Sequence, residues 1–164
     1  MVTWREAPVT SPTAIRLLTE YFNARAAGFP GGPSGYHATH PGEKDFLQPN
    51  GVFLIVLCEA DVSSRPVAVG CGGIRRAPAG EASDIRFEVK HLWLQPRARG
   101  RGSGRALLEE LESRARGFGA TELVLDTNSS LEAATGLYRS SGFVSIAPYN
   151  DNPNATNWYG KQLV

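Results

Sequence analysis

A glycine-rich turn between an apolar, strand-like segment and an amphipathic helix constrains the fold of this chain more than any other feature. The turn reads Arg-Gly-Arg-Gly-Ser-Gly over residues 99–104, and further arginines stand at 97 and 105. Glycine has no Cβ atom, so the backbone of such a turn can approach an anion closely, and the first N–H groups of the next helix point toward that anion. The pattern therefore predicts a phosphate-binding loop.

Two common phosphate-binding patterns do not fit this turn. A dinucleotide-binding fold requires G-x-G-x-x-G after its first strand, whereas this turn reads G-x-G-x-G and comes late in the chain. A Walker loop requires lysine after its last glycine, and Gly104 is followed by Arg105. The remaining alternative is a solvated, arginine-rich helix start in which the glycines supply only flexibility.

The strand-like segment before the turn changes its alternation part-way along. Apolar residues occupy positions 85, 87 and 89, and then positions 92 and 94. A period of two residues thus shifts by one around Lys90 and His91, which predicts a β-bulge. A bulge bends a strand away from its neighbour and frees backbone groups, and bulges are frequent beside active sites.

Residues 88–108 resemble the acetyl-CoA signature of the GNAT (Gcn5-related) N-acetyltransferases, and residues 134–143, which contain Leu137-Tyr138 and Gly142-Phe143, resemble the second signature of that superfamily. The resemblance implies an α/β (α+β) fold over a single domain of residues 1–164. Its central sheet would be mixed but largely antiparallel, with a bulged fourth strand and about four flanking helices. It also implies acetyl-CoA as the acyl donor and direct transfer to an amine in a ternary complex.

The resemblance assigns two catalytic roles. Glu88 matches a carboxylate that accepts the proton of the acceptor ammonium, and Tyr138 matches a tyrosine that donates a proton to the sulfur of coenzyme A. Glu88 has an alternative role, which is to bind a cationic acceptor or to pair with Lys90 or Arg86. The alternative for Tyr138 is an aromatic residue packed on an amphipathic helix. No metal site is predicted.

The remaining donor contacts follow from the same resemblance. The backbone around Leu92, Trp93 and Leu94 would bind the thioester and the pantetheine arm. Many relatives have asparagine where this chain has Leu131, and Asn128 and Ser130 are the candidates to replace it. The pyrophosphate would lie against the turn and its arginines, which are Arg99, Gly100, Arg101, Gly102, Ser103, Gly104 and Arg105.

The acceptor is not encoded in these motifs. A carboxylate at position 88 with nearby aromatic rings suits a small cationic amine or an α-amino group. A protein lysine or N-terminal acetyltransferase and a non-catalytic CoA-binding module are alternatives, and an acetyltransferase acting on charged tRNA is disfavoured by the balanced charge. The candidate acceptor residues, each of which is alternatively an ordinary loop or surface residue, are Tyr36, His37, His40, His91 and Trp93.

Local patterns predict the other elements. They are a strand over 2–6, a helix from Ser11-Pro12 with Ile15, Leu18 and Phe22 on one face, a possible short helix after loop 28–41, paired strands over 52–58 and 66–74, a helix over 103–116, a buried strand over 123–125, a helix that a Ser129/Glu132 capping box begins and Gly142 ends, and a closing hairpin of 143–146 with 158–163.

Length and composition indicate the class of protein and its location. The 164 residues, 41% of them hydrophobic, suit one domain. The sequence has no run of 18 apolar residues, so we expect no membrane span. Without a secretory pattern, we expect a cytoplasmic protein whose two cysteines are free thiols. The net charge of +1, with basic residues gathered at 97–105, argues against a nucleic-acid partner. The edge of the C-terminal hairpin makes a homodimer possible.

Overall fold

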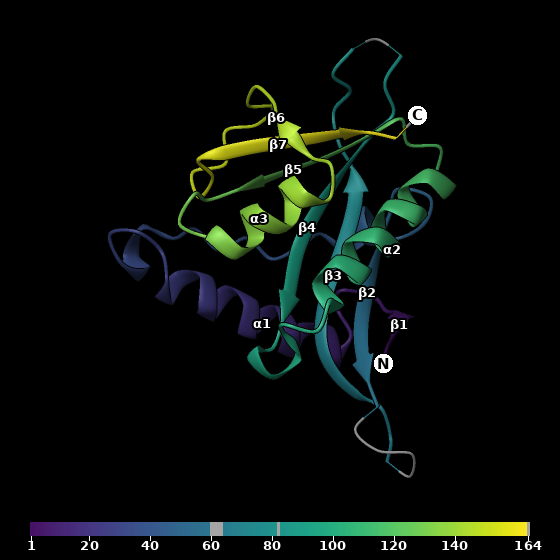
Figure 1. The fold of residues 1–164 in the computed structure, drawn as a ribbon, viewed down its shortest axis with the longest axis vertical. Coiled ribbons are helices and arrows are strands. Elements are labelled where there is room, and N and C mark those ends of the chain that lie inside the picture. The colour runs from purple at the N-terminus through teal and green to yellow at the C-terminus, as the bar shows by residue number, and fades with distance from the viewer. Residues whose placement is uncertain (60–63, 82, 164) are drawn as a thin grey trace.

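The computed structural model describes residues 1–59, 64–81 and 83–163. Across these residues a seven-stranded sheet has the order β1-β2-β3-β4-β5-β7-β6, and helices cover both of its faces (Figure 1). The strands are β1 (Val2–Glu6), β2 (Gly51–Cys58), β3 (Val67–Arg76), β4 (Arg86–Leu94), β5 (Glu122–Thr127), β6 (Val144–Ser145) and β7 (Asn157–Gln162). The α-helices are α1 (Pro12–Ala27), α2 (Ser103–Gly117) and α3 (Glu132–Ser140), with short 3₁₀ helices η1 (Pro33–Gly35), η2 (Glu43–Phe46) and η3 (Pro96–Ala98).

The mixed, largely antiparallel sheet is confirmed. Every neighbouring pair of strands runs antiparallel except β4 and β5, which are parallel. A parallel pair needs a long crossover connection. The chain supplies this connection as η3 and α2, so the glycine-rich turn lies at the start of the crossover helix.

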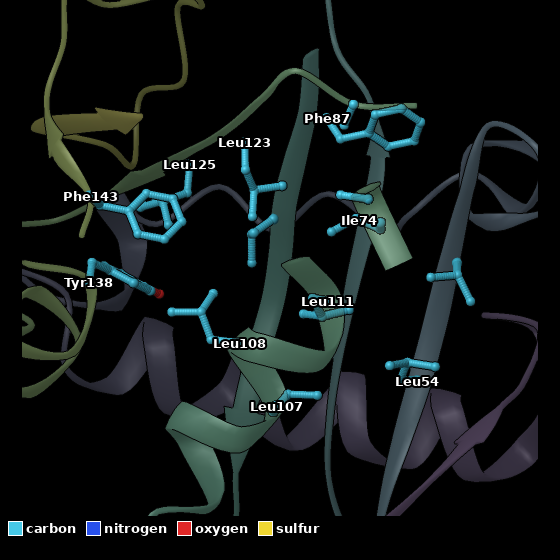
Figure 2. Close-up of a cluster of buried hydrophobic side chains, with 14 of the residues drawn as sticks. Leu54, Ile74, Phe87, Leu107, Leu108, Leu111, Leu123, Leu125, Tyr138 and Phe143 are labelled. Atoms are coloured by element: carbon cyan, nitrogen blue, oxygen red, sulfur yellow. The ribbon is translucent and has the colours of Figure 1, made fainter. Parts of the chain in front are cut away.

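The sheet has a separate hydrophobic core on each face because β2 is apolar along nearly its whole length. Val52, Leu54 and Val56 point into the core under α2, whereas Phe53 and Ile55 point into the core under α1. Successive side chains of a strand face opposite ways, so a continuous apolar run suits a strand that is covered on both sides. Figure 2 shows the first core, in which Leu107, Leu108 and Leu111 of α2 lie over the sheet.

The β-bulge that the sequence predicts is confirmed. Gly73 pairs with Lys90 and Cys71 with Trp93, so two residues of β4 lie opposite Gly72 alone. One of the two, His91, has φ of 57°. A left-handed backbone is uncommon for residues other than glycine, which marks His91 as the point where the strand bends.

β4 and β5 diverge soon after they begin. They pair only over Arg86–Glu88 and Glu122–Val124, and Figure 1 shows β5 running away from β4 beyond that point. The ion pair between Arg86 and Glu122, 2.8 Å long and largely buried, holds the paired end together. The rest of β4 therefore has no partner strand on the side of β5.

The structure corrects three details of the sequence analysis. The described residues contain three α-helices, where about four helices were expected, and the possible short helix after loop 28–41 is the 3₁₀ helix η2. Ile15 is 45% exposed, and α1 instead buries Ala14, Leu17 and Leu18. The Ser129/Glu132 capping box does not form, because Asn128 Oδ1 accepts the Ser130 N–H in a local turn and the helix begins only at Glu132.

Two further observations concern the setting of the chain. Cys58 and Cys71 are both free cysteines, as the sequence predicts. Among the described residues, none of the helices combines the length and the hydropathy that crossing a membrane would require.

The burial of α1 predicts unequal effects of two substitutions on one helix. We expect Leu18→Ala to lower the free energy of unfolding by about 2–5 kcal/mol, because it leaves a cavity in the core under α1. Ile15→Ala is the matched control and should change it by no more than about 0.5 kcal/mol, since that side chain is exposed. Urea denaturation measures both values, and equal losses would place Ile15 in the core after all.

Candidate active site

A cavity of about 900 Å³ occupies the space between the diverging strands β4 and β5. Its walls come from these two strands, from α1 and α3, and from two loops that are distant in sequence, one around residues 36–41 and one around residues 150–155. The glycine-rich turn reaches the cavity through Arg99, Gly100 and Gly104. A single space therefore connects the predicted phosphate-binding loop with the predicted acceptor residues.

The glycine-rich turn has the backbone geometry of an anion cradle. Gly100 and Gly102 have φ of 75° and 79°, which residues with a side chain rarely adopt, and a Cβ atom at either position would meet no protein atom within 4 Å. Hydrogen bonding within α2 begins with the Ala106 N–H, so in the described structure the N–H groups of Ser103, Gly104 and Arg105 have no protein acceptor. Free N–H groups at a helix start form an anion site.

The arginines of the turn have different surroundings. Arg99 donates its Nε hydrogen to the Leu94 carbonyl oxygen at 2.9 Å and stacks on the Trp93 ring at 4.8 Å, which holds it at the cavity wall. Arg105 is bound to the end of α3 through Ser140 and Ser141, away from the cavity. Arg101, Gly102 and Ser103 line a second, smaller hollow of about 330 Å³.

The predicted donor-binding segment of β4 lies along the main cavity. Leu92, Trp93 and Leu94 all line it, on the stretch of β4 that has no partner strand toward β5. Of the two candidates to replace the asparagine of other family members, Ser130 lines the cavity together with Leu131. Asn128 is buried outside it and donates a hydrogen bond to the Asn154 carbonyl oxygen at 3.1 Å.

The Tyr138 hydroxyl is available to a ligand. The ring is only 8% exposed and packs against Phe143 and Tyr159, and Figure 2 shows it among the core side chains. The residue nevertheless lines the cavity, and within the described structure its hydroxyl has no hydrogen-bond partner. Burial raises the pKa of Tyr138, so the hydroxyl keeps its proton at neutral pH.

Glu88 does not line the cavity. Its side chain is 3% exposed, and Oε1 accepts a hydrogen bond from Arg75 Nε at 3.0 Å and forms an ion pair with Arg75 Nη2 at 3.0 Å. Oε2 accepts the Tyr149 hydroxyl at 2.6 Å and lies 3.5 Å from Lys90 Nζ. Burial, followed by the charge of Glu88, raises the pKa of Tyr149, which therefore remains a donor. Arg86, the other partner considered from the sequence, pairs with Glu122 instead.

The family model of the "Acetyltransferase (GNAT) family" matches residues 15–143, which is more than half of the chain. The chain belongs to the GNAT acetyltransferase family. The match extends from α1 to Phe143 and so contains the turn, the bulge and Tyr138.

Named relatives and solved structures agree with this assignment. An IAA acetyltransferase from Azospirillum brasilense is 40% identical over 81 residues, which cover 49% of this chain and 50% of the relative. The N-alpha-acetyltransferase RimI of Mycobacterium tuberculosis is 43% identical over 78 residues, covering 48% and 46%. The chain thus spans about half the length of these relatives. A GNAT acetyltransferase from Staphylococcus aureus shares the fold with a TM-score of 0.77 at 15% identity, over 100% of both chains.

In this GNAT chain an aspartate that sequence reasoning missed faces the cavity. Asp126 stands near the end of β5, across the divergence from Lys90, and its Oδ1 accepts a hydrogen bond from Lys90 Nζ at 3.1 Å. Oδ2 accepts from the side-chain amides of Asn150 and Asn152, at 2.7 and 3.1 Å. Although burial raises its pKa, the Lys90 charge and the two amides prevail and lower it. The asparagines at positions 150, 152 and 154 were the sequence signal that could have indicated a polar, hydrogen-bonded loop beside this aspartate.

All five candidate acceptor residues of this GNAT chain line the cavity. The loop that carries Tyr36 and His37 is attached to the 150–155 loop, because Asn154 Oδ1 accepts the His37 N–H at 2.9 Å and Asn154 Nδ2 donates to the His37 carbonyl at 2.7 Å. We call these two hydrogen bonds the Asn154 clasp. They join segments 117 residues apart in sequence across the cavity wall.

His91 is held among aromatic rings at the bulge. The rings of Tyr21, Phe22 and Phe46 lie between 5.5 and 5.8 Å from its imidazole, and its Nδ1 is buried without a hydrogen-bond partner in the described structure. Burial, assisted by the charge of Lys90, lowers the pKa of His91 to about 3. The imidazole is therefore neutral at physiological pH.

The depressed pKa of His91 predicts a pH-dependent stability. The unfolded chain binds this proton near pH 6.5 and the folded chain only near pH 3, so stability is full above pH 6.5 and decreases as the pH falls. Between pH 7 and pH 5 we expect a loss of about 2 kcal/mol in the free energy of unfolding. Asparagine tolerates the left-handed backbone at this position and does not titrate, so His91→Asn should remove that loss. Urea denaturation at both pH values tests this, and an equal loss of unfolding free energy in the variant and the original protein would contradict it.

Proposed function

We propose that this GNAT chain is an acetyl-CoA-dependent N-acetyltransferase that transfers the acetyl group to the primary amine of a small molecule, directly and in a ternary complex. The observation that carries the proposal is Tyr138, which lines the same cavity as the anion cradle and the unpaired edge of β4 and whose hydroxyl has no hydrogen-bond partner in the described structure. A binding module without catalysis would have no use for a proton donor at that position.

The residues of the chain fit the donor. The free N–H groups of Ser103 to Arg105, together with the Arg99 guanidinium, would hold the pyrophosphate. The free edge of β4 at Leu92 to Leu94 would accept and donate hydrogen bonds along the pantetheine arm, and Ser130 is our candidate for the hydrogen bond that Leu131 cannot make. When bound, acetyl-CoA supplies an acetyl thioester whose C–S bond breaks as the acceptor nitrogen forms the new C–N bond.

Tyr138 completes the proton balance of the transfer. Its phenol delivers one proton to the departing sulfur, and its raised pKa keeps that proton in place until then. An acceptor that enters as an ammonium ion loses two protons in becoming an amide. One of them restores the phenol, and the other passes to solvent. The cavity therefore needs a protonated tyrosine and a path for one proton.

The contacts of Glu88 favour an indirect role over proton transfer. Arg75, Tyr149 and Lys90 surround its carboxylate, and Glu88 is not among the residues that line the cavity. Arg75 and Lys90 do line the cavity, so Glu88 orients two cations at its acceptor end, by which we mean the part bordered by the 36–41 and 150–155 loops. The role of Glu88 as general base remains a prediction of the sequence, and we propose positioning of Lys90 and Arg75 as its function.

The Asn154 clasp supports a small acceptor over a protein. It joins the two loops that border the acceptor end, which confines the space available to a polypeptide. The similarity to RimI favours an N-terminal acetyltransferase as the second candidate. We retain the cytoplasm as the predicted location, and a homodimer as a possible assembly through the edge strand β6, where Val144 is 64% exposed.

Thiol release from acetyl-CoA tests the proposed function. We expect release with small primary amines and little with peptides that offer a free N-terminus or lysine. Tyr138→Phe keeps the ring and removes the proton donor, so turnover should fall about 100-fold or more while acetyl-CoA still raises the melting temperature. Phe118→Leu is the control: this ring packs on Phe87 away from the cavity, so the variant should lose stability and keep its turnover. Release with peptides alone would favour the second candidate, and full activity of Tyr138→Phe would exclude its role.

Glu88→Gln separates positioning from proton transfer. As a positioning residue, Glu88 should when replaced lower turnover by about tenfold or more while the pH dependence of turnover keeps its shape, because the titrating group is elsewhere. Acetyl-CoA binding, measured by thermal unfolding, should persist. Loss of the rise in rate toward alkaline pH would instead restore Glu88 as the general base.

A further inference from the structure

The charges on the cavity wall do not balance. Among the described residues the wall carries four cations, Arg25, Arg75, Lys90 and Arg99, against the two carboxylates Asp126 and Glu132. Lys90 is paired with Asp126, and Arg75 is paired with Glu88 outside the wall. Arg99 belongs to the donor end, beside Gly100 of the cradle. The acceptor end therefore contains one cation that needs separate explanation.

That cation is Arg25, in the last turn of α1. It is half-buried, and its guanidinium lies over the Tyr21 ring, 5.8 Å from the centroid. No carboxylate pairs with it anywhere in the described structure. Burial raises the pKa values of Tyr21, Tyr36 and Tyr138, and the charge of Arg25 opposes the rise at all three hydroxyls, aided at Tyr36 by a side-chain hydrogen bond from Arg25. Arg25 and Tyr138 line the same cavity.

The guanidinium of Arg25 is partly buried and has no carboxylate partner in the described structure. Charged groups taken from water are normally paired, and the planar fork of arginine matches a carboxylate with two parallel hydrogen bonds. The C-terminal end of a helix tolerates a cation through its dipole, but this does not require the cation to face a cavity. The Tyr21 ring holds the guanidinium in place before any ligand arrives, which lowers the entropic cost of binding.

We propose that the acceptor is a primary amine that also carries a carboxylate, as amino acids do, and that Arg25 binds this carboxylate. The inference rests on the proposed function and names the substrate class of the same site. A carboxylate is favoured over a phosphate because one guanidinium balances one negative charge, whereas a phosphate carries nearly two at neutral pH. A purely cationic amine would meet Arg25 with like charge and is disfavoured.

Matched acceptors test the inference. The full chain is assayed by thiol release from acetyl-CoA with amino acids and their carboxamides, in pairs such as glycine and glycinamide, β-alanine and β-alaninamide, and phenylalanine and phenylalaninamide. We expect the carboxylate member of at least one pair to have a kcat/KM about 10- to 100-fold higher, the range that a hydrogen bond to a charged group provides.

Variants assign the preference to Arg25. Arg25→Gln should lower kcat/KM for the carboxylate member by about 10- to 100-fold and leave the carboxamide nearly unchanged, and Arg25→Lys should recover some of the loss. The control is Arg5→Gln, an exposed position on β1 away from the cavity, which should leave both acceptors unchanged. Thermal unfolding with acetyl-CoA confirms that each variant is folded and binds the donor.

The outcomes separate this inference from the proposed function. Acetylation of the carboxamides at equal or greater rates, or equal losses for both members in Arg25→Gln, would overturn the carboxylate site and leave the small-amine transferase intact. Acetylation of none of the amines by a chain that still binds acetyl-CoA would overturn the proposed function and this inference with it.

Discussion

The early end of hydrogen bonding between β4 and β5 is the constraint on which the rest of the site depends. The two strands pair over only three residues each, where the buried Arg86–Glu122 ion pair holds them. Beyond that point the bulge at His91 bends β4 away, and the unpaired edge of the strand borders a cavity. Unpaired backbone groups away from water are costly, so a strand edge of this kind is stable only beside solvent or a ligand.

Polar side chains bridge β4 and β5 where their backbones no longer pair. Lys90 bridges from β4 to Asp126 on β5, and the amides of Asn150 and Asn152 occupy the other oxygen of Asp126. The loop that supplies these amides also forms the Asn154 clasp. The loop between β6 and β7 thus contacts both Asp126, where β4 and β5 separate, and the 36–41 loop at the acceptor end. A substitution in this loop would therefore change both parts of the cavity wall.

Much of this site could be predicted because its signals are local. The shift in alternation at Lys90 and His91 predicts the bulge, since side chains of a strand alternate with a period of two. The glycines of the turn predict a backbone that an anion can approach closely, and Gly100 and Gly102 have positive φ angles that other residues rarely adopt. The capping box failed for an equally local reason, because Asn128 competes for the backbone hydrogen bonds. The prediction that Ile15 lies on the buried face of α1 was wrong, because helical periodicity leaves two neighbouring faces nearly equivalent until packing against the sheet selects one.

The sequence by itself determined the family, the order of the elements, the bulge and the glycine-rich turn before α2, because backbone geometry and alternation depend on neighbouring residues. Only the tertiary structure decided which charges face the cavity. It placed Glu88 behind Arg75 and Tyr149, and it brought Asp126 and Arg25 to the wall. Whether a charge is neutralised depends on groups from other elements within a few ångströms, and spacing along the chain carries no record of that distance.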